Sequence, residues 1–245
     1  EETNFAMAVK TFQLTARYDA AISNYLGKIA PDGQKKQFPD TYTVQFALAQ
    51  GLRYGENPHQ MAAFYRENTP MLSAVSNARQ LQGKELSYNN IMDSDAAWQA
   101  VADHAKPAAV IMKHANPCGA ATSEGDITDA YQKAMATDPA SAFGGIVALN
   151  RRVDRKAAEE LAKTFLEVII APGFDEDAKE ILAAKKNVRV LEIQPAADSR
   201  SAGYDFRRVV GGLLVQERDT DDFDIRSAKV VTKRQPTEEE YQALD

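Results

Sequence analysis

Two of the three histidines in the sequence lie in polar stretches whose residue types suit chemistry. The stretch Lys113-His114-Ala115-Asn116-Pro117-Cys118-Gly119 directly follows an apolar run that we predict to be a buried strand. Ligands of parallel α/β sheets bind at the carboxyl ends of strands, so Lys113 and His114 occupy a position where chemistry is expected. A histidine removes a proton near neutral pH, and a lysine stabilises an oxyanion or a phosphate. The pair therefore suits group transfer to an amine.

Two further stretches crowd polar, glycine and proline residues beyond the needs of a connecting loop. The first, Leu52–Gln60, contains Arg53, whose planar guanidinium suits phosphate or carboxamide recognition, and Tyr54, which adds an aromatic face or a hydroxyl group. The second, Thr137–Gly145, leads into a predicted strand, and its glycines allow the backbone to approach a ligand closely. Arg53 and Tyr54 are equally compatible with a plain surface position.

Other interpretations of the His114 stretch stay open from these residues. A deaminase-type zinc site requires a glutamate two residues after the histidine and a Pro-Cys-x-x-Cys loop. Here Asn116 and Ala121 stand at the positions of the glutamate and the second cysteine, which argues against such a site. Cys118 as a nucleophile is a weaker hypothesis, because cysteine is among the most often buried residues. A core histidine bonded to a backbone carbonyl remains the structural alternative for His114.

The composition excludes several classes of protein. A formal net charge of -6 and a pI near 5.3 argue against a general nucleic-acid binder and a polybasic membrane-surface protein. The single cysteine cannot form an intramolecular disulfide, and no apolar run reaches the roughly 18 residues of a membrane span. A cytoplasmic location is therefore expected, with a partner that is either a small molecule or a protein.

Hydrophobic spacing predicts an α/β layered fold with a mostly parallel or mixed sheet. A helix is expected from Phe5 to Leu26, ended by a left-handed Gly27. The other expected helices are capped by Asp93, by Ser123 or Asp126, by Asp154 and by Asp175. The expected strands are Tyr42–Phe46 at an edge, Ala108–Met112, Gly145–Leu149, Val168–Ala171, Val188–Ile193, Val209–Val215 and Lys229–Thr232.

Both ends of the sequence suggest a piece of a longer protein. The chain opens inside or just before the first helix, and Thr237 and Glu240 have the spacing of a capping box for a last helix. That helix has room for only about two turns before Asp245, fewer than an isolated helix needs. We therefore expect a fragment whose C-terminus is a truncation or a proteolytic end, and a frayed natural tail is the alternative for that end.

Six segments together resemble the bacterial bifunctional AICAR transformylase/IMP cyclohydrolase family. The resemblance is collinear along nearly the whole chain, and its segments are Leu52–Gln60, Leu86–Asn90 with Asp93 and Asp95, Lys113–Gly119, Asp138–Gly145, Ile169–Pro172 and Thr232–Thr237. It implies that residues 1–27 are the helical tail of the cyclohydrolase domain, 28–41 a linker, and 42–245 the first part of the transformylase domain. The implied fold of that domain is an α/β/α, cytidine-deaminase-like unit without zinc, which fits the degenerate zinc motif.

The resemblance implies an activity and a set of site residues. The family transfers a formyl group from 10-formyltetrahydrofolate to the 5-amino group of AICAR, and its other domain closes the ring to IMP. His114 would take the amine proton, and Lys113 would stabilise the oxyanion or protonate the departing folate nitrogen. The matching substrate positions are Arg53, Tyr54, Asn90, Phe143, Gly144 and, near the folate, Glu167. The implied assembly is a homodimer with the site at its interface.

Two competing classes remain. One is a non-catalytic binding or assembly module on a decayed zinc-deaminase fold, and the other is a zinc deaminase. Family segments that complete the site would lie beyond Asp245, so the 245-residue chain alone is expected to be inactive in both reactions.

Overall fold

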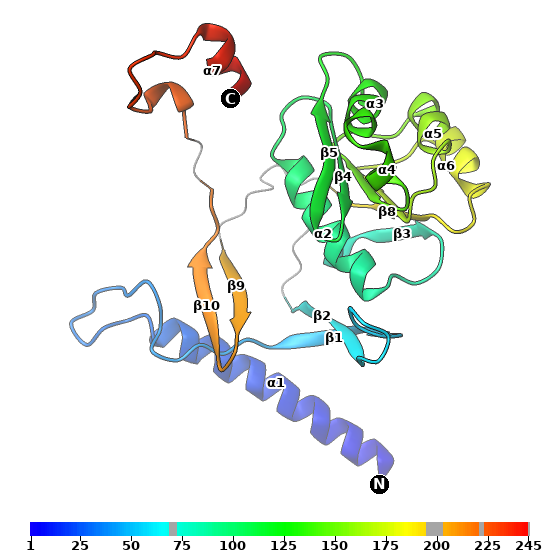
Figure 1. The fold of residues 1–245 in the computed structure, drawn as a ribbon. Coiled ribbons are helices and arrows are strands. Elements are labelled where there is room, and N and C mark those ends of the chain that lie inside the picture. The colour runs from blue at the N-terminus through cyan, green and yellow to red at the C-terminus, as the bar shows by residue number, and fades with distance from the viewer. Residues whose placement is uncertain (69–72, 195–202, 221–222, 245) are drawn as a thin grey trace. The chain divides into compact units, whose positions relative to one another are not determined.

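The computed structural model describes residues 1–68, 73–194, 203–220 and 223–244, drawn in Figure 1. The chain divides into two compact units, residues 1–195 and 196–245. Asp245, the predicted end of the last helix, lies outside the described residues. No helix in the described ranges is long and apolar enough to cross a bilayer.

The first unit is built on a six-stranded mixed sheet with the order β3-β8-β7-β6-β4-β5. Strands β6, β7 and β8 are parallel, whereas β4 pairs antiparallel with both β5 and β6, and β3 pairs antiparallel with β8. The strands are β3 (Arg79–Gln82), β4 (Ala108–Lys113), β5 (Asn116–Thr122), β6 (Ile146–Leu149), β7 (Val168–Ala171) and β8 (Arg189–Glu192). The prediction of an α/β fold with a mixed sheet is confirmed.

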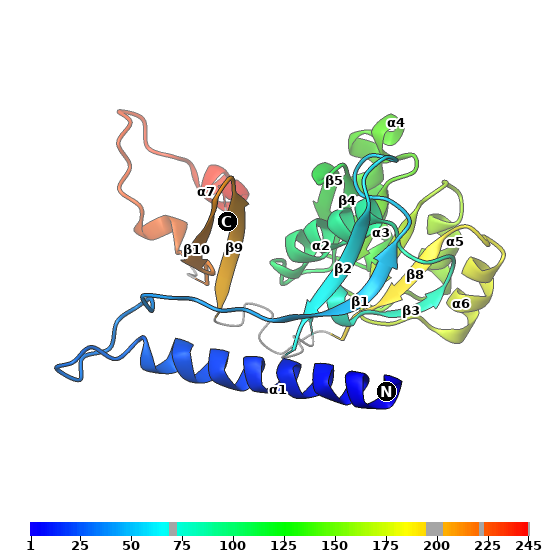
Figure 2. The same cartoon turned by 90° about the horizontal axis from the view of Figure 1, so that it is seen from below.

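Helices cover both faces of this sheet. The helices are α2 (Tyr88–Ala102), α3 (Ile127–Thr137), the short α4 (Pro139–Ala142), α5 (Arg155–Leu161) and α6 (Glu176–Ala183), and a 3-10 turn, η1, spans Val75–Asn77. Buried side chains of α2 form one core with one sheet face, and those of α3, α5 and α6 form another with the opposite face. Helices α5 and α6 lie side by side in both views (Figure 2). This arrangement is a three-layer α/β/α unit.

The central strands are apolar along their whole length because each of their faces is covered. In β4, the side chains of Ala109 and Ile111 pack on the sheet face that α3 covers, whereas those of Val110 and Met112 pack on the face that α2 covers. Strands β6 and β7 alternate in the same way, and all their residues are buried. Side chains alternate between the faces of a strand, so these continuous apolar runs require helices on both sides.

One helix start differs from the sequence-based expectation, and three agree with it. Helix α2 begins at Tyr88 and not at Asp93, because Ser87 and Asn90 form a complete capping box one turn earlier. Asp126, not Ser123, caps α3, since its carboxylate accepts the Asp129 N–H at 2.9 Å. The expected caps Asp154 and Asp175 occupy the N-cap positions of α5 and α6.

The amino-terminal part of the first unit contains helix α1 (Glu2–Leu26) and an antiparallel ribbon of β1 (Phe46–Leu52) and β2 (Ala62–Glu67). The prediction that Gly27 is left-handed is wrong, because its φ is -61°. The absence of a side chain at Gly27 instead permits close approach to Pro39. The expected strand at Tyr42–Phe46 begins only at Phe46. Before it, the backbone N–H and C=O of Thr43 bond to the Asn24 side chain at 3.0 and 2.8 Å, in place of a neighbouring strand.

The second unit has a hairpin and short helical segments. The single strand expected at Val209–Val215 is two strands, β9 (Tyr204–Val209) and β10 (Gly212–Glu217), because a turn with Gly211 at φ 77° separates them. Lys229–Thr232 is not a strand, since no described strand pairs with it. After the 3-10 turn η2 (Ile225–Ser227), α7 (Glu238–Leu244) follows the predicted capping box, in which the Thr237 and Glu240 side chains each accept the other's backbone N–H.

Candidate functional site

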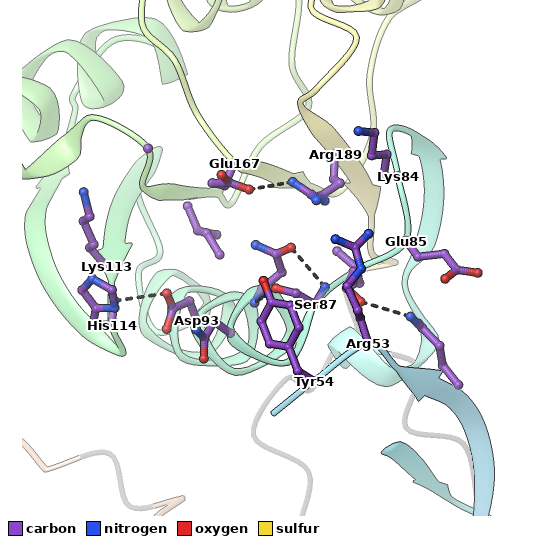
Figure 3. Close-up of a pocket in the computed structure, with 16 residues that line it drawn as sticks. Arg53, Tyr54, Lys84, Glu85, Ser87, Asp93, Lys113, His114, Glu167 and Arg189 are labelled. Carbon is purple, nitrogen blue, oxygen red and sulfur yellow. Dashed lines mark hydrogen bonds and ion pairs between the residues drawn. The ribbon is translucent and has the colours of Figure 1, made fainter. Parts of the chain in front are cut away.

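Most of the site residues predicted from the sequence line a cavity of about 650 Å³ (Figure 3). Seven of the predicted site residues line it: Arg53, Tyr54, Asn90, Lys113, His114, Gly144 and Glu167. Phe143 does not line it, but its backbone carbonyl accepts a hydrogen bond from Lys113 Nζ at 2.7 Å. The other lining residues are Gln50, Lys84, Glu85, Leu86, Ser87, Asn89, Asp93, Ile146 and Arg189.

The cavity lies at one edge of the central sheet. Lys113 is the last residue of β4, and β4 runs antiparallel to β6. The cavity therefore lies where β4 ends and where the parallel strands β6, β7 and β8 begin. The expectation of a site at the carboxyl ends of parallel strands is therefore wrong, although Lys113 does end its own strand. The same reversal explains why Gly144, Glu167 and Arg189, which precede or begin the parallel strands, meet Lys113 here.

His114 lies in a tight turn between β4 and β5. The turn has two residues, His114 and Ala115, because Lys113 pairs directly with Asn116. Both have φ 55°, the left-handed conformation typical of type I′ hairpin turns, where asparagine and glycine are preferred. Left-handed backbone costs about 1–3 kcal/mol for each residue other than glycine. The segment that sequence reasoning treated as a polar loop is thus a strained turn followed by an edge strand.

The Asp93 carboxylate holds this turn. Its Oδ2 accepts the His114 N–H at 3.1 Å, and its Oδ1 accepts the Ala115 N–H at 2.8 Å. The Asp93 side chain extends from α2 toward the turn, and the residue is only 7% exposed (Figure 3). The predicted role of Asp93 as a helix cap is wrong, because its oxygens bond to the turn.

The Lys113 ammonium group bridges two segments of the site. It donates to the Phe143 carbonyl, which leaves further N–H donors for a ligand. The Phe143 ring packs against Phe165 with centroids 5.5 Å apart, and Gly144, with φ 69°, donates its N–H to the Phe165 carbonyl at 2.8 Å. These contacts fix the backbone of residues 143–144 beside Lys113.

Arg53 and Tyr54 follow directly after β1 and face Lys113 and His114 across the cavity (Figure 3). The loop after them is closed internally, since the Gly55 N–H bonds to the Gln60 carbonyl at 2.8 Å and Gln60 Oε1 accepts the Asn57 N–H at 2.9 Å. His59 lies in this loop and does not line the cavity. The Leu52–Gln60 motif therefore combines two cavity residues with a structural hairpin loop.

Asn90 has a structural role as well as a place in the cavity. Its Oδ1 accepts the Ser87 N–H at 3.1 Å, and its own N–H donates to Ser87 Oγ at 3.1 Å. The Nδ2 group is the part of this amide that can donate to a ligand. The neighbouring Asn89 Oδ1 is buried without a partner among the described residues, which points to a ligand or water at this wall.

Arg189 is the principal site residue that sequence reasoning missed. Its Nη1 lies 2.6 Å from Glu167 Oε2, and its side chain is only 15% exposed. Arg189 Nε is buried without a partner among the described residues. The available signal was a charged residue between Val188 and Val190, within an otherwise apolar strand segment.

The charges in the cavity favour an anionic ligand. Its cationic residues are Arg53, Lys84, Lys113 and Arg189, and its carboxylates are Glu85, Asp93 and Glu167. Two of these carboxylates are already engaged, Asp93 by backbone N–H groups and Glu167 by Arg189. A phosphate or carboxylate placed among the remaining cations would gain charge-assisted hydrogen bonds.

Cys118 does not line this cavity and does not suit its chemistry. Cys118 lies in β5, its Sγ is 3.5 Å from the Ile111 carbonyl, and burial raises the pKa of its thiol. A raised pKa lowers the thiolate fraction, so Cys118 is a packing residue and a poor nucleophile. The described residues contain no group of three or more histidine, cysteine, aspartate or glutamate side chains able to hold a metal ion.

Comparison with known families supplies the identity that the geometry alone leaves open. A model of the family described as AICARFT/IMPCHase bienzyme matches residues 1–245, the whole of the chain. The resemblance found in the sequence segments is confirmed. The chain therefore belongs to the AICARFT/IMPCHase bienzyme family, the AICAR formyltransferase/IMP cyclohydrolase enzymes of purine biosynthesis.

Proposed function

We propose that the cavity binds AICAR and catalyses formyl transfer to it from 10-formyltetrahydrofolate. The observation that carries this proposal is the convergence of Arg53, Tyr54, Lys113, His114 and Glu167 on one cavity from separate segments of the chain. A volume of about 650 Å³ lies within the range of small-molecule sites. Among the described lining residues, four cationic side chains face three carboxylates, and this excess of positive charge suits a ribotide phosphate.

His114 is the proposed general base. The 5-amino group of AICAR is a weak nucleophile because its lone pair is delocalised into the imidazole and the carboxamide. Removing one proton as the nitrogen attacks the formyl carbon makes this attack feasible at neutral pH. The imidazole of His114 is exposed at the turn and has no hydrogen-bond partner among the residues that the structure describes. In the proposed complex the carboxamide of AICAR orients it.

Lys113 is the proposed source of positive charge in the transition state. Attack forms the new C–N bond and places negative charge on the formyl oxygen, and the ammonium group stabilises that oxyanion. The bond from the formyl carbon to the folate nitrogen then breaks, and that nitrogen takes a proton from Lys113 or from protonated His114. The products are formyl-AICAR and tetrahydrofolate. The bond to the Phe143 carbonyl holds Nζ in place for this work.

The remaining predicted residues have proposed binding roles. Arg53 binds the phosphate, because its guanidinium offers two parallel donors, and Tyr54 lies beside it. Asn90 donates through Nδ2, while residues 143–144 form the backbone wall beside the ribotide. Glu167, held by Arg189, lies on the folate side of the site in this proposal. A second copy of the chain completes the site, as the resemblance implies.

A formyl-transfer assay tests the function. The full-length protein, mixed with 10-formyltetrahydrofolate and AICAR, is expected to release tetrahydrofolate at a rate that depends on both substrates. Calorimetry is expected to detect AICAR binding to the same protein. A protein that binds neither substrate would be the non-catalytic module. Stoichiometric zinc together with ammonia release from a nucleobase would instead identify a deaminase.

A further inference from the structure

His114 lies in the β4–β5 turn, whose left-handed backbone is held by contacts from outside the turn. We propose that Asp93 is the positioning residue for His114: its carboxylate holds the turn in the left-handed conformation that aims the imidazole into the cavity. This inference rests on the proposed function, in which His114 is the base. Asp93 lies against the backbone of the turn and is not proposed to touch the reacting atoms.

The turn is not favoured by its own residues. His114 and Ala115 both have φ 55°, which is uncommon for any residue other than glycine; histidine adopts this conformation more often than most residues, but alanine does not. A two-residue turn of this type commonly carries Asn-Gly or Asp-Gly. Strained backbone of this kind persists where surrounding contacts determine it, and such positions cluster at active sites. The strain therefore calls for an external restraint.

Asp93 supplies the restraint from a different element. Its two oxygens accept the two successive N–H groups of the turn, at 3.1 and 2.8 Å. On the carbonyl side, Asn116 Nδ2 donates to the His114 carbonyl at 2.9 Å. Helix α2, which carries Asp93, packs against β4 through the buried Trp98 and Val101 core, so the carboxylate is held on a rigid element.

A carboxylate fits this role better than other side chains. A buried aspartate inside a helix lowers stability unless its oxygens are bonded, and here the two bonds go to the turn. Asparagine has the same shape but only one acceptor oxygen, so one turn N–H would lose its partner. Asp93→Asn therefore removes half of the restraint with almost no change in volume.

The test compares two matched variants in the natural protein. With Asp93→Asn we expect kcat for formyl transfer to fall about 100-fold, with KM for AICAR changed much less, because misplacement of a catalytic group costs about this much. The control is Asp154→Asn, the N-cap of α5, whose carboxylate also accepts a backbone N–H but lies outside the cavity. This control is expected to keep the wild-type kcat.

Rescue separates positioning from general damage. Glycine adopts positive φ readily, so adding Ala115→Gly to Asp93→Asn is expected to recover about 10-fold of the lost kcat. An Asp93→Asn variant with wild-type kcat, or one whose kcat Ala115→Gly fails to raise, would overturn the proposal.

Amide hydrogen exchange gives a readout that does not depend on catalysis. The His114 and Ala115 N–H groups are expected to exchange slowly in the wild type and at least 10-fold faster in Asp93→Asn, because a bonded amide must open before it exchanges. Equal exchange in the two proteins would refute the restraint. A wild type that transfers no formyl group would refute the proposed function, while this exchange measurement would still test the role of Asp93.

Discussion

Replacing His114 with alanine in the natural protein is expected to lower the formyl-transfer rate by about 10²–10⁴-fold, the range of a lost general base. The IMP cyclohydrolase reaction is expected to continue at the wild-type rate, because the resemblance assigns it to the other domain. The two reactions are measured on the same preparation, one by tetrahydrofolate release and the other by IMP formation from added formyl-AICAR. The unchanged second activity shows that the cyclohydrolase domain of the variant protein is folded, and AICAR binding measured by calorimetry shows the same for the domain that carries His114.

His104 offers a matched control for this substitution. It is an exposed histidine that precedes β4, whereas His114 follows the same strand, and it does not line the cavity. His104→Ala is expected to keep both activities. If His114→Ala transfers formyl groups as fast as His104→Ala does, His114 is not the base and the mechanism proposed for the cavity is wrong.

Gly119→Ala is expected to destabilise the first unit by about 3 kcal/mol or more, the upper part of the range for overpacking. Gly119 is buried in β5 where this strand packs against α3. A Cβ atom at this position would lie 2.1 Å from the Ala134 carbonyl oxygen and 2.9 Å from its carbon. Both atoms belong to helix backbone, so neither can move without shifting α3 away from the sheet.

Chemical denaturation, followed by the fluorescence of the single Trp98, measures this loss. Gly125→Ala is the control, because a Cβ there meets only Ser123 Oγ at 3.5 Å, an ordinary contact distance. The control is expected to unfold within about 1 kcal/mol of the wild type, the scale of ordinary glycine-to-alanine effects. A Gly119→Ala protein as stable as the control would show that β5 and α3 are not packed as described.

Much of the sheet was predictable from apolar runs. Ala108–Met112 and Val168–Ala171 are continuous because both of their faces are covered, and such runs have few alternatives within an α/β pattern. The predicted caps Asp126 and Asp154 are also confirmed, since an aspartate that accepts the N–H three residues later is a local interaction. Local signals of this kind need no knowledge of the tertiary fold.

Strand direction and long-range contacts were not predictable in the same way. The residues of Ala108–Met112 do not indicate that β4 runs antiparallel to β6. This antiparallel direction places Glu167 and Arg189 at the cavity beside the end of β4. Asp93 looked like a helix cap because its partners, 21 and 22 residues away, exist only once α2 packs on β4. Asn116–Gly119 looked like a loop because its glycine and proline are poor strand formers, and its pairing with β4 overrides that preference.

In the proposed complex, this cavity holds AICAR with its amine beside His114. A crystal structure of the natural protein with AICAR bound tests this arrangement most directly, and also shows whether a second copy contributes to the site. We expect a ring nitrogen of His114 to lie about 2.6–3.2 Å from the 5-amino nitrogen, with the phosphate at Arg53. AICAR bound elsewhere, or in this cavity with its amine beyond the reach of His114, would contradict the account.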